Sequence, residues 1–160
     1  IGFYPKRNGY RLISEAEWEY MARYHNRKRK VKYTWGDDDV VPVNAGNLAD
    51  ENASGSVSKY ISGYRDAYVG AAPVGSFPKE KSGLYDLTGN VSEWVHDVYT
   101  LTPPMPDEVH IDPLGPQAGV SHVVKGSSFN SASVTELRAS FRDGSESPRN
   151  DLGFRIARYL

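Results

Sequence analysis

Two acidic residues flank a glycine turn in the run Gly83–Val95, and their spacing is suited to binding a metal ion. Asp86 precedes Gly89 and Glu93 follows it, so a turn at the glycine can bring both carboxylates together while main-chain carbonyls point inward. Hard cations such as Ca²⁺ prefer this mixture of carboxylate and backbone oxygen. A tight turn with solvated acids gives the same local pattern. The run alone therefore leaves both interpretations open.

Composition excludes several kinds of function. The 160 residues are enough for one domain with a core of its own. A net charge of −1 gives no support for a nucleic-acid partner or an anionic membrane surface, and no stretch approaches the ~18 apolar residues of a membrane-spanning helix. Cysteine is absent, which removes thiol chemistry and disulfides from this chain. Ile1 is an unusual first residue, so we expect a trimmed or excised domain.

The elements that must position these acids are short. Ser14 and Glu17 form a capping box, which predicts a helix from Glu15 to about residues 25–26 with Trp18 on its apolar face. Strands are predicted over residues 74–77, 91–99, 122–125, 136–141 and 154–158. Residues 40–70 are rich in Gly, Asn, Ser and Asp, and residues 101–119 are interrupted by prolines, so both should be irregular. One helix, several short strands and long ordered loops indicate an α+β fold.

Six other motifs accompany the Gly83–Val95 run in a fixed order. They lie at residues 11–20, 33–37, 72–78, 124–129, 138–142 and 152–157. In this order and spacing the set resembles the formylglycine-generating enzyme (sulfatase-modifying factor) domain family, over about Tyr10 to Leu160. The resemblance implies an irregular, loop-rich variant of the C-type lectin fold. Family members normally carry further strands before the first motif, so residues 1–160 are expected to be one such domain, either naturally short or the C-terminal portion of a longer domain or protein.

The resemblance also implies two calcium sites whose ligand positions can be matched one by one. The first uses side chains at Asn47 and Asp66 and carbonyls at Leu48 and Tyr68. The second uses side chains at Asp86 and Glu93 and carbonyls at Gly89 and Val91. A cation that ties Asn47 to Asp66 would help to order the irregular residues 40–70. Side-chain hydrogen bonds to the backbone, without a metal, are the alternative.

Catalysis is where the sequence departs from the family. Formylglycine-generating enzymes oxidise a sulfatase cysteine with two copper-binding cysteines of their own. The corresponding interval here, residues 129–138, contains no thiol, and Ser131 stands near the first missing cysteine. A hydroxyl is a poor ligand for a soft metal and cannot replace thiolate redox chemistry. The resemblance therefore implies a non-catalytic member, a pseudoenzyme that needs no copper.

A polar segment remains as the candidate binding surface. In the family the region of residues 129–150 borders the substrate groove, which implies contact with a peptide, protein or glycan. The candidate contact residues are Asn130, Ser131, Ser133, Arg142 and Arg149. As an alternative, the arginines Arg138, Arg142 and Arg155 are structural and pair with acids such as Asp143, Glu146 or Asp151.

The leading functional prediction is a calcium-stabilised binding or scaffold module. Two alternatives are an enzyme of the family with formylglycine-generating or other oxidative chemistry, or the accessory domain of a larger enzyme. A third is a structural part of a cell-surface assembly. Calcium dependence favours an extracytoplasmic bacterial location, periplasm or cell surface, because free cytosolic calcium is scarce.

Overall fold

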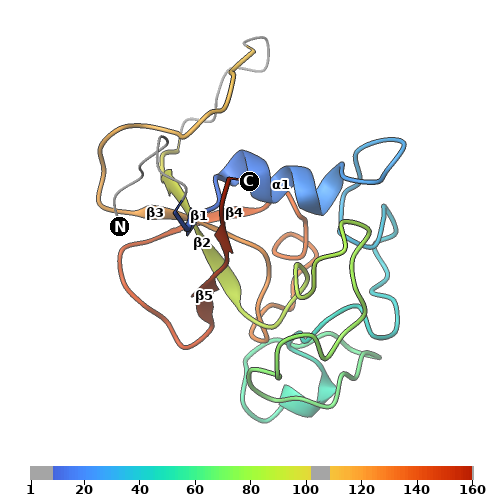
Figure 1. Ribbon diagram of the computed structural model, residues 1–160. Helices are drawn as coiled ribbons and strands as arrows, with labels where there is room; N and C mark the ends of the chain where they lie inside the picture. Colours follow the sequence, from blue (N-terminus) through green and yellow to red (C-terminus); the bar gives the residue numbers. More distant parts are fainter. Residues whose placement is uncertain (1–8, 102–108, 160) are drawn as a thin grey trace.

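The computed structural model describes residues 9–101 and 109–159 (Figure 1). A four-stranded sheet has the order β4-β3-β2-β5. Its strands are β2 (Ser92–Val98), β3 (His122–Lys125), β4 (Arg142–Ser145) and β5 (Leu152–Phe154). β3 is antiparallel to both β2 and β4, whereas β5 is parallel to β2. The predicted strands at residues 91–99 and 122–125 are confirmed, and their apolar positions form the centre of the sheet.

A second, two-stranded sheet joins distant parts of the chain. β1 (Arg11–Leu12) pairs antiparallel with β6 (Ile156–Ala157), with Arg11 opposite Ala157. The predicted strand at residues 154–158 is therefore present in a divided form, because β5 ends at Phe154 and β6 begins at Ile156. Arg155 lies at the break, outside both strands, and its side chain bonds to Glu93.

The predicted helix α1 spans Glu15–Arg23. Ser14 Oγ accepts a bond from Glu17 N, and the Glu17 carboxylate accepts one from Ser14 N, so the capping box is complete. The helix ends at Arg23, two to three residues before the predicted end. Trp18 and Ala22 on its buried face pack with Val95 and Val123 of the sheet. This contact forms the main core and brings α1 against the strand that contains Glu93.

The segment between α1 and β2 is almost entirely loop, as predicted for residues 40–70. Its one short regular piece is the 3₁₀ helix η1 (Glu51–Ala53), capped by Asp50. Figure 1 shows this cyan and green part of the chain as a group of loops beside the helix and sheet. Tyr33, Leu48 and Tyr64 of these loops form a second core with Leu137, which follows β3 in the chain. In the described part of the chain, no helix has the length and apolar character needed to cross a membrane.

Two predicted strands are wrong. Residues 74–77 form a turn, because Ser76 N donates to Pro73 O and Gly75 has a φ of +78°. Residues 136–141 form consecutive turns held by local bonds such as Leu137 N to Ser133 O, and β4 begins only at Arg142. In both places short-range backbone bonds replace the pairing that the apolar pattern suggested.

Candidate metal centres and ligand surface

The first predicted cation site is gathered around Asp66. Its Oδ2 accepts a bond of 2.7 Å from Leu48 N, and its Oδ1 accepts one of 2.9 Å from Tyr68 N. Asn47 precedes Leu48 and is fully buried. Ala67, between Asp66 and Tyr68, adopts a φ of +76°, a region that costs a residue with a Cβ about 1 kcal/mol or more. The structure thus brings all four predicted residues of this site together, with Asn47, Leu48 and Asp66 buried and Tyr68 half-buried.

The side-chain amide of Asn47 has a fixed orientation. Its Nδ2 donates to Gly70 O at 2.8 Å and to Asn90 Oδ1 at 3.3 Å. Its Oδ1 is buried and has no hydrogen-bond partner. A buried carbonyl oxygen without a partner is costly, on the order of 1–3 kcal/mol, and it is a suitable ligand for a hard cation.

The electrostatics of this junction also favour a cation. Burial raises the pKa of Asp66, and the neighbouring carboxylate of Asp50 raises it further. Asp50 is fully buried and its Oδ2 accepts a bond from Asp66 N at 2.7 Å. Among residues 9–101 and 109–159, neither acid has an ion-pair partner. A divalent ion here would offset the desolvation of both carboxylates.

The second predicted site occupies the turn before β2. Asp86 has a φ of +57° and Gly89 a φ of +73°. Asp86 Oδ2 accepts a bond of 2.8 Å from Gly75 N, whereas its Oδ1 is buried without a partner. Val91 lies at the end of the turn, and Ser92 begins β2. The turn therefore presents an unsatisfied carboxylate oxygen from one predicted ligand, as the first site does with its amide.

Glu93, the last predicted ligand, is already engaged. Its Oε2 accepts bonds from Trp18 Nε1 at 2.7 Å and Arg155 Nε at 2.6 Å, and its Oε1 accepts one from an Arg155 amino group. The same amino group also donates to Tyr85 O at 3.2 Å. Arg155 thus links both ends of the turn. A cation at this site would share Glu93 with a guanidinium.

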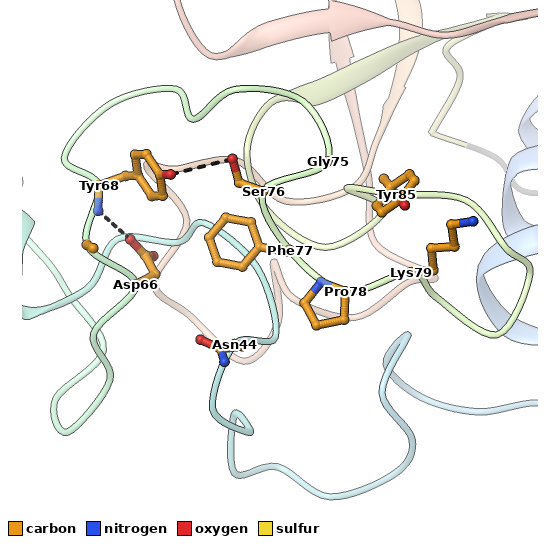
Figure 2. Close-up of a pocket in the computed structure, with 10 residues that line it drawn as sticks. Asn44, Asp66, Tyr68, Gly75, Ser76, Phe77, Pro78, Lys79 and Tyr85 are labelled. Atoms are coloured by element: carbon orange, nitrogen blue, oxygen red, sulfur yellow. Dashed lines mark hydrogen bonds between the residues drawn. The ribbon is translucent and has the colours of Figure 1, made fainter.

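A pocket of about 640 Å³ lies beside both predicted sites. Figure 2 shows Asp66 and Tyr68 on one side of Phe77 and Pro78, with Tyr85 and Lys79 on the other. Gly75, which donates to Asp86, is part of its wall. In the described residues no group of three or more His, Asp or Glu side chains converges to hold a metal. Both candidate centres would therefore depend in part on main-chain oxygens, and the first also on the amide oxygen of Asn47.

The predicted ligand surface is only partly assembled. Asn130 N donates to Ser128 Oγ, which donates to Asp151 Oδ2, and Asp151 Oδ1 accepts a bond from Arg149 Nε. Ser131 joins this group through Ser128, because its Oγ accepts a bond from Ser128 N. These contacts place Asn130, Ser131 and Arg149 near one another, with Asn130 and Arg149 exposed and Ser131 half-buried.

Ser133 and Arg142 lie outside that group. Ser133 Oγ accepts a bond from Glu136 N and shapes a local turn. Arg142 forms a two-pronged ion pair with Glu15 of α1, with N–O distances of 2.8 and 2.9 Å. The structural alternative for the arginines is therefore correct for Arg142 and Arg155, but their partners are Glu15 and Glu93. Of the acids suggested earlier, Asp143 and Asp151 pair with Arg149.

Two residues of these sites received no role from the sequence. Asp50 accepts four bonds, from the main chain of η1, the Asn52 amide and Asp66 N. Asn90 bonds to Asn47 and to Ala72. Asp50 lies in the irregular residues 40–70 and Asn90 in the Gly83–Val95 run. An Asp before a 3₁₀ helix or an Asn after a turn glycine is the sequence pattern that could have predicted these bonds.

Comparisons with known proteins identify the family of this chain. Residues 3–160 match the family model described as "Sulfatase-modifying factor enzyme 1-like domain". The formylglycine-generating enzyme of Streptomyces coelicolor is 31% identical over 158 residues, which cover 96% of this chain and 48% of that protein. The inactive C-alpha-formylglycine-generating enzyme 2 of Mus musculus is 33% identical, covering 98% of this chain and 45% of that protein.

Solved structures give the same result for the fold. Treponema denticola variable protein 1 superimposes with a TM-score of 0.67 at 26% sequence identity, over 96% of this chain and 49% of that protein. The irregular α+β architecture predicted from the sequence is thereby confirmed. The chain spans about half the length of the curated relatives that it matches. It belongs to the sulfatase-modifying-factor (formylglycine-generating-enzyme-like) family.

Proposed function

We propose that this chain is a non-catalytic, calcium-stabilised module of its family that binds a peptide, protein or glycan. One observation supports the calcium part above all others. In the described part of the chain, three buried side-chain oxygens lack a hydrogen-bond partner: Asn47 Oδ1, Asp86 Oδ1 and Ser82 Oγ. The first two belong to the two predicted cation sites, one to each. Folded proteins rarely leave such atoms unsatisfied.

The residues present fit a hard divalent cation. Asn47 and Asp66, with the carbonyls of Leu48 and Tyr68, would hold one ion. Asp86 and Glu93, with the carbonyls of Gly89 and Val91, would hold the other. Bound calcium would supply positive charge to buried carboxylates and a cross-link between loop segments. The turns of the chain hold the backbone in place and so position these oxygens.

The lack of thiols supports a role without catalysis. None of the 160 residues is cysteine, and Ser131 uses its hydroxyl to accept a bond from Ser128 N. Its main-chain oxygen accepts a bond from Ala49 N, which ties this turn to the loop that contains Asn47. Asn130 and Arg149 are the candidate ligand contacts that lie next to it. A cation that orders the Asn47 loop would therefore also support the binding surface.

Thermal and urea unfolding in EDTA and in excess Ca²⁺ test this proposal. Calcium at about 100 times its Kd should add about 2.7 kcal/mol per occupied site to the free energy of unfolding. Asp66→Asn and Asp86→Asn should each reduce that gain. Asp143→Asn is the matched control, because this acid pairs with Arg149 outside both sites, and it should keep the full gain. Equal stability of the wild-type chain with and without calcium would contradict the proposal.

A further inference from the structure

Asn90 belongs to the turn of the second predicted site but directs its side chain to the first. It lies between the two predicted carbonyl ligands Gly89 and Val91, has a φ of +64° and is buried. Its Oδ1 accepts bonds from Asn47 Nδ2 at 3.3 Å and from Ala72 N at 2.9 Å, and its Nδ2 donates to Ala72 O. Its main-chain N donates to Asn47 O at 2.8 Å. Two separate bonds therefore join Asn90 to Asn47.

These bonds decide which end of the Asn47 amide faces the first site. Both acceptors around Asn47 Nδ2, Gly70 O and Asn90 Oδ1, are oxygens. A flipped amide would place the Asn47 oxygen against them, and acceptor–acceptor repulsion would replace two hydrogen bonds. The observed orientation leaves Oδ1 buried and unsatisfied on the opposite side. Asn90 thus prepares the oxygen that a cation would need.

The backbones at this junction are too close to move separately. A Cβ built on Gly89 would lie 2.1 Å from Asn47 O, and one built on Gly46 would lie 2.1 Å from Thr88 O. Gly89 and Asn47 also form an isolated parallel bridge. The turn of the second site and the loop of the first therefore behave as one packed body at this point, which provides a direct physical path for energetic coupling.

We propose that Asn90 is a positioning residue that couples the two cation sites, so that occupancy of one raises the affinity of the other. This inference rests on the proposed function, because it requires both sites to bind a divalent cation. An ion in the second site fixes the turn at Gly89 and Val91. The fixed turn holds Asn90, and Asn90 holds the Asn47 oxygen ready for the first ion. Coupling of this kind between neighbouring sites commonly changes affinity by about 5–150-fold.

Calorimetric titration of the whole chain with CaCl₂ tests the coupling. Asp86→Asn weakens the second site and reports the affinity of the first site alone, and Asp66→Asn reports the second alone. We expect Asp86→Asn to lower the affinity of the first site at least about fivefold. Linkage requires Asp66→Asn to lower that of the second by the same factor. General destabilisation of the fold by either substitution would not have to give equal factors.

Asn90→Gly removes the side chain and keeps a residue suited to a positive φ. In this background the first site should bind more weakly, and adding Asp86→Asn should have no further effect on it. The matched control is Asn26→Gly, since Asn26 also has a positive φ, +54°, and donates from its side chain to a distant carbonyl, Lys81 O. It should leave both affinities and their coupling unchanged.

The outcomes separate the two proposals. Absence of binding to the wild-type chain overturns both the proposed function and the coupling. Binding of two ions, with each single-site variant keeping the wild-type affinity at its remaining site, overturns the coupling alone. If Asn90→Gly does not fold, the reciprocal comparison of Asp86→Asn with Asp66→Asn still decides whether the two sites are coupled, and absence of coupling overturns the proposal.

Discussion

Arg155 Nε lies 2.6 Å from Glu93 Oε2, and this ion pair connects the break between β5 and β6 to the buried strand β2. The Glu93 side chain is only 7% exposed and that of Arg155 21%. We expect Arg155→Met to lower the free energy of unfolding by about 3 kcal/mol, because it leaves a buried carboxylate without its cation. Urea unfolding in EDTA measures this without a contribution from bound metal.

Arg149→Met is the control for that variant. Arg149 pairs with Asp143 and Asp151 at the surface, where removal of an ion pair costs about 1 kcal/mol or less. Equal losses in the two variants would show that burial of Glu93 does not matter.

Gly89→Ala tests the close approach of two backbones. The new methyl group would meet Asn47 O at 2.1 Å and force the loop and turn apart, so we expect a loss of several kcal/mol. Gly83→Ala separates this clash from backbone strain. Gly83 has a similar φ of +83° but nothing within 4 Å of an added Cβ. It should lose only about 1 kcal/mol, and the difference in unfolding free energy between the two variants measures the steric contact.

Lys125 is a fully buried cation whose removal should be tolerated if its volume is kept. Its Nζ lies 3.3 Å from Glu19 Oε2 and 3.8 Å from Glu15 Oε1, and burial lowers its pKa. Arg23 and Arg142 remain to neutralise these two acids. Lys125→Met should therefore change the free energy of unfolding by less than about 1.5 kcal/mol.

Lys125→Ala provides the comparison, because it leaves a cavity and should cost about 2 kcal/mol or more. Losses of the same size in the Met and Ala variants would show that the charge, rather than the volume, is what the core requires.

Asp97 should make the protein less stable as pH rises. Burial raises its pKa and the Glu15 carboxylate raises it further, against the lowering effect of the bond from Glu15 N. The folded chain therefore holds this proton above the ordinary aspartate pKa of about 4, where the unfolded chain has lost it. Stability attributable to Asp97 is full below that value and declines as pH rises through the folded-state pKa.

Asp97→Asn removes this titration. The asparagine keeps an oxygen that can accept the bond from Glu15 N, which is 2.7 Å long in the wild-type chain. Urea unfolding at a series of pH values should show a flatter profile for the variant above about pH 4, with no loss of stability at neutral pH. A profile parallel to that of the wild type would contradict the assignment.

Sequence rules that use only neighbouring residues predicted the elements that short-range interactions determine. The capping box at Ser14 fixed the start of α1, and β-branched residues marked β2 and β3. The same rules failed at residues 74–77, where Pro73 and Gly75 form a turn. The apolar pattern there reflects Phe77, which is buried in the loop region without any strand.

Contacts between residues far apart in the chain could not be predicted from the spacing of residues in the sequence. The arginines were expected to pair with acids nearby in sequence, but Arg142 pairs with Glu15 and Arg155 with Glu93, across different elements. The residues of the first predicted cation site lie together around Asp66, whereas Glu93 of the second is paired with Trp18 and Arg155. Metal binding at both sites stays a prediction. The link between Asn47 and Asn90 depends on a close approach of two glycine-containing backbones, which no local pattern reveals.

The pairing of β1 with β6 has a consequence for the order of folding. Arg11 lies opposite Ala157, so this small sheet closes a loop that contains nearly the whole chain. The entropy lost in closing such a loop is recovered only when the rest of the structure already holds the two ends near each other. We therefore expect β1–β6 to form late, after β2 and β3 have nucleated the core. Substitutions in these two strands should mainly accelerate unfolding and leave the folding rate almost unchanged.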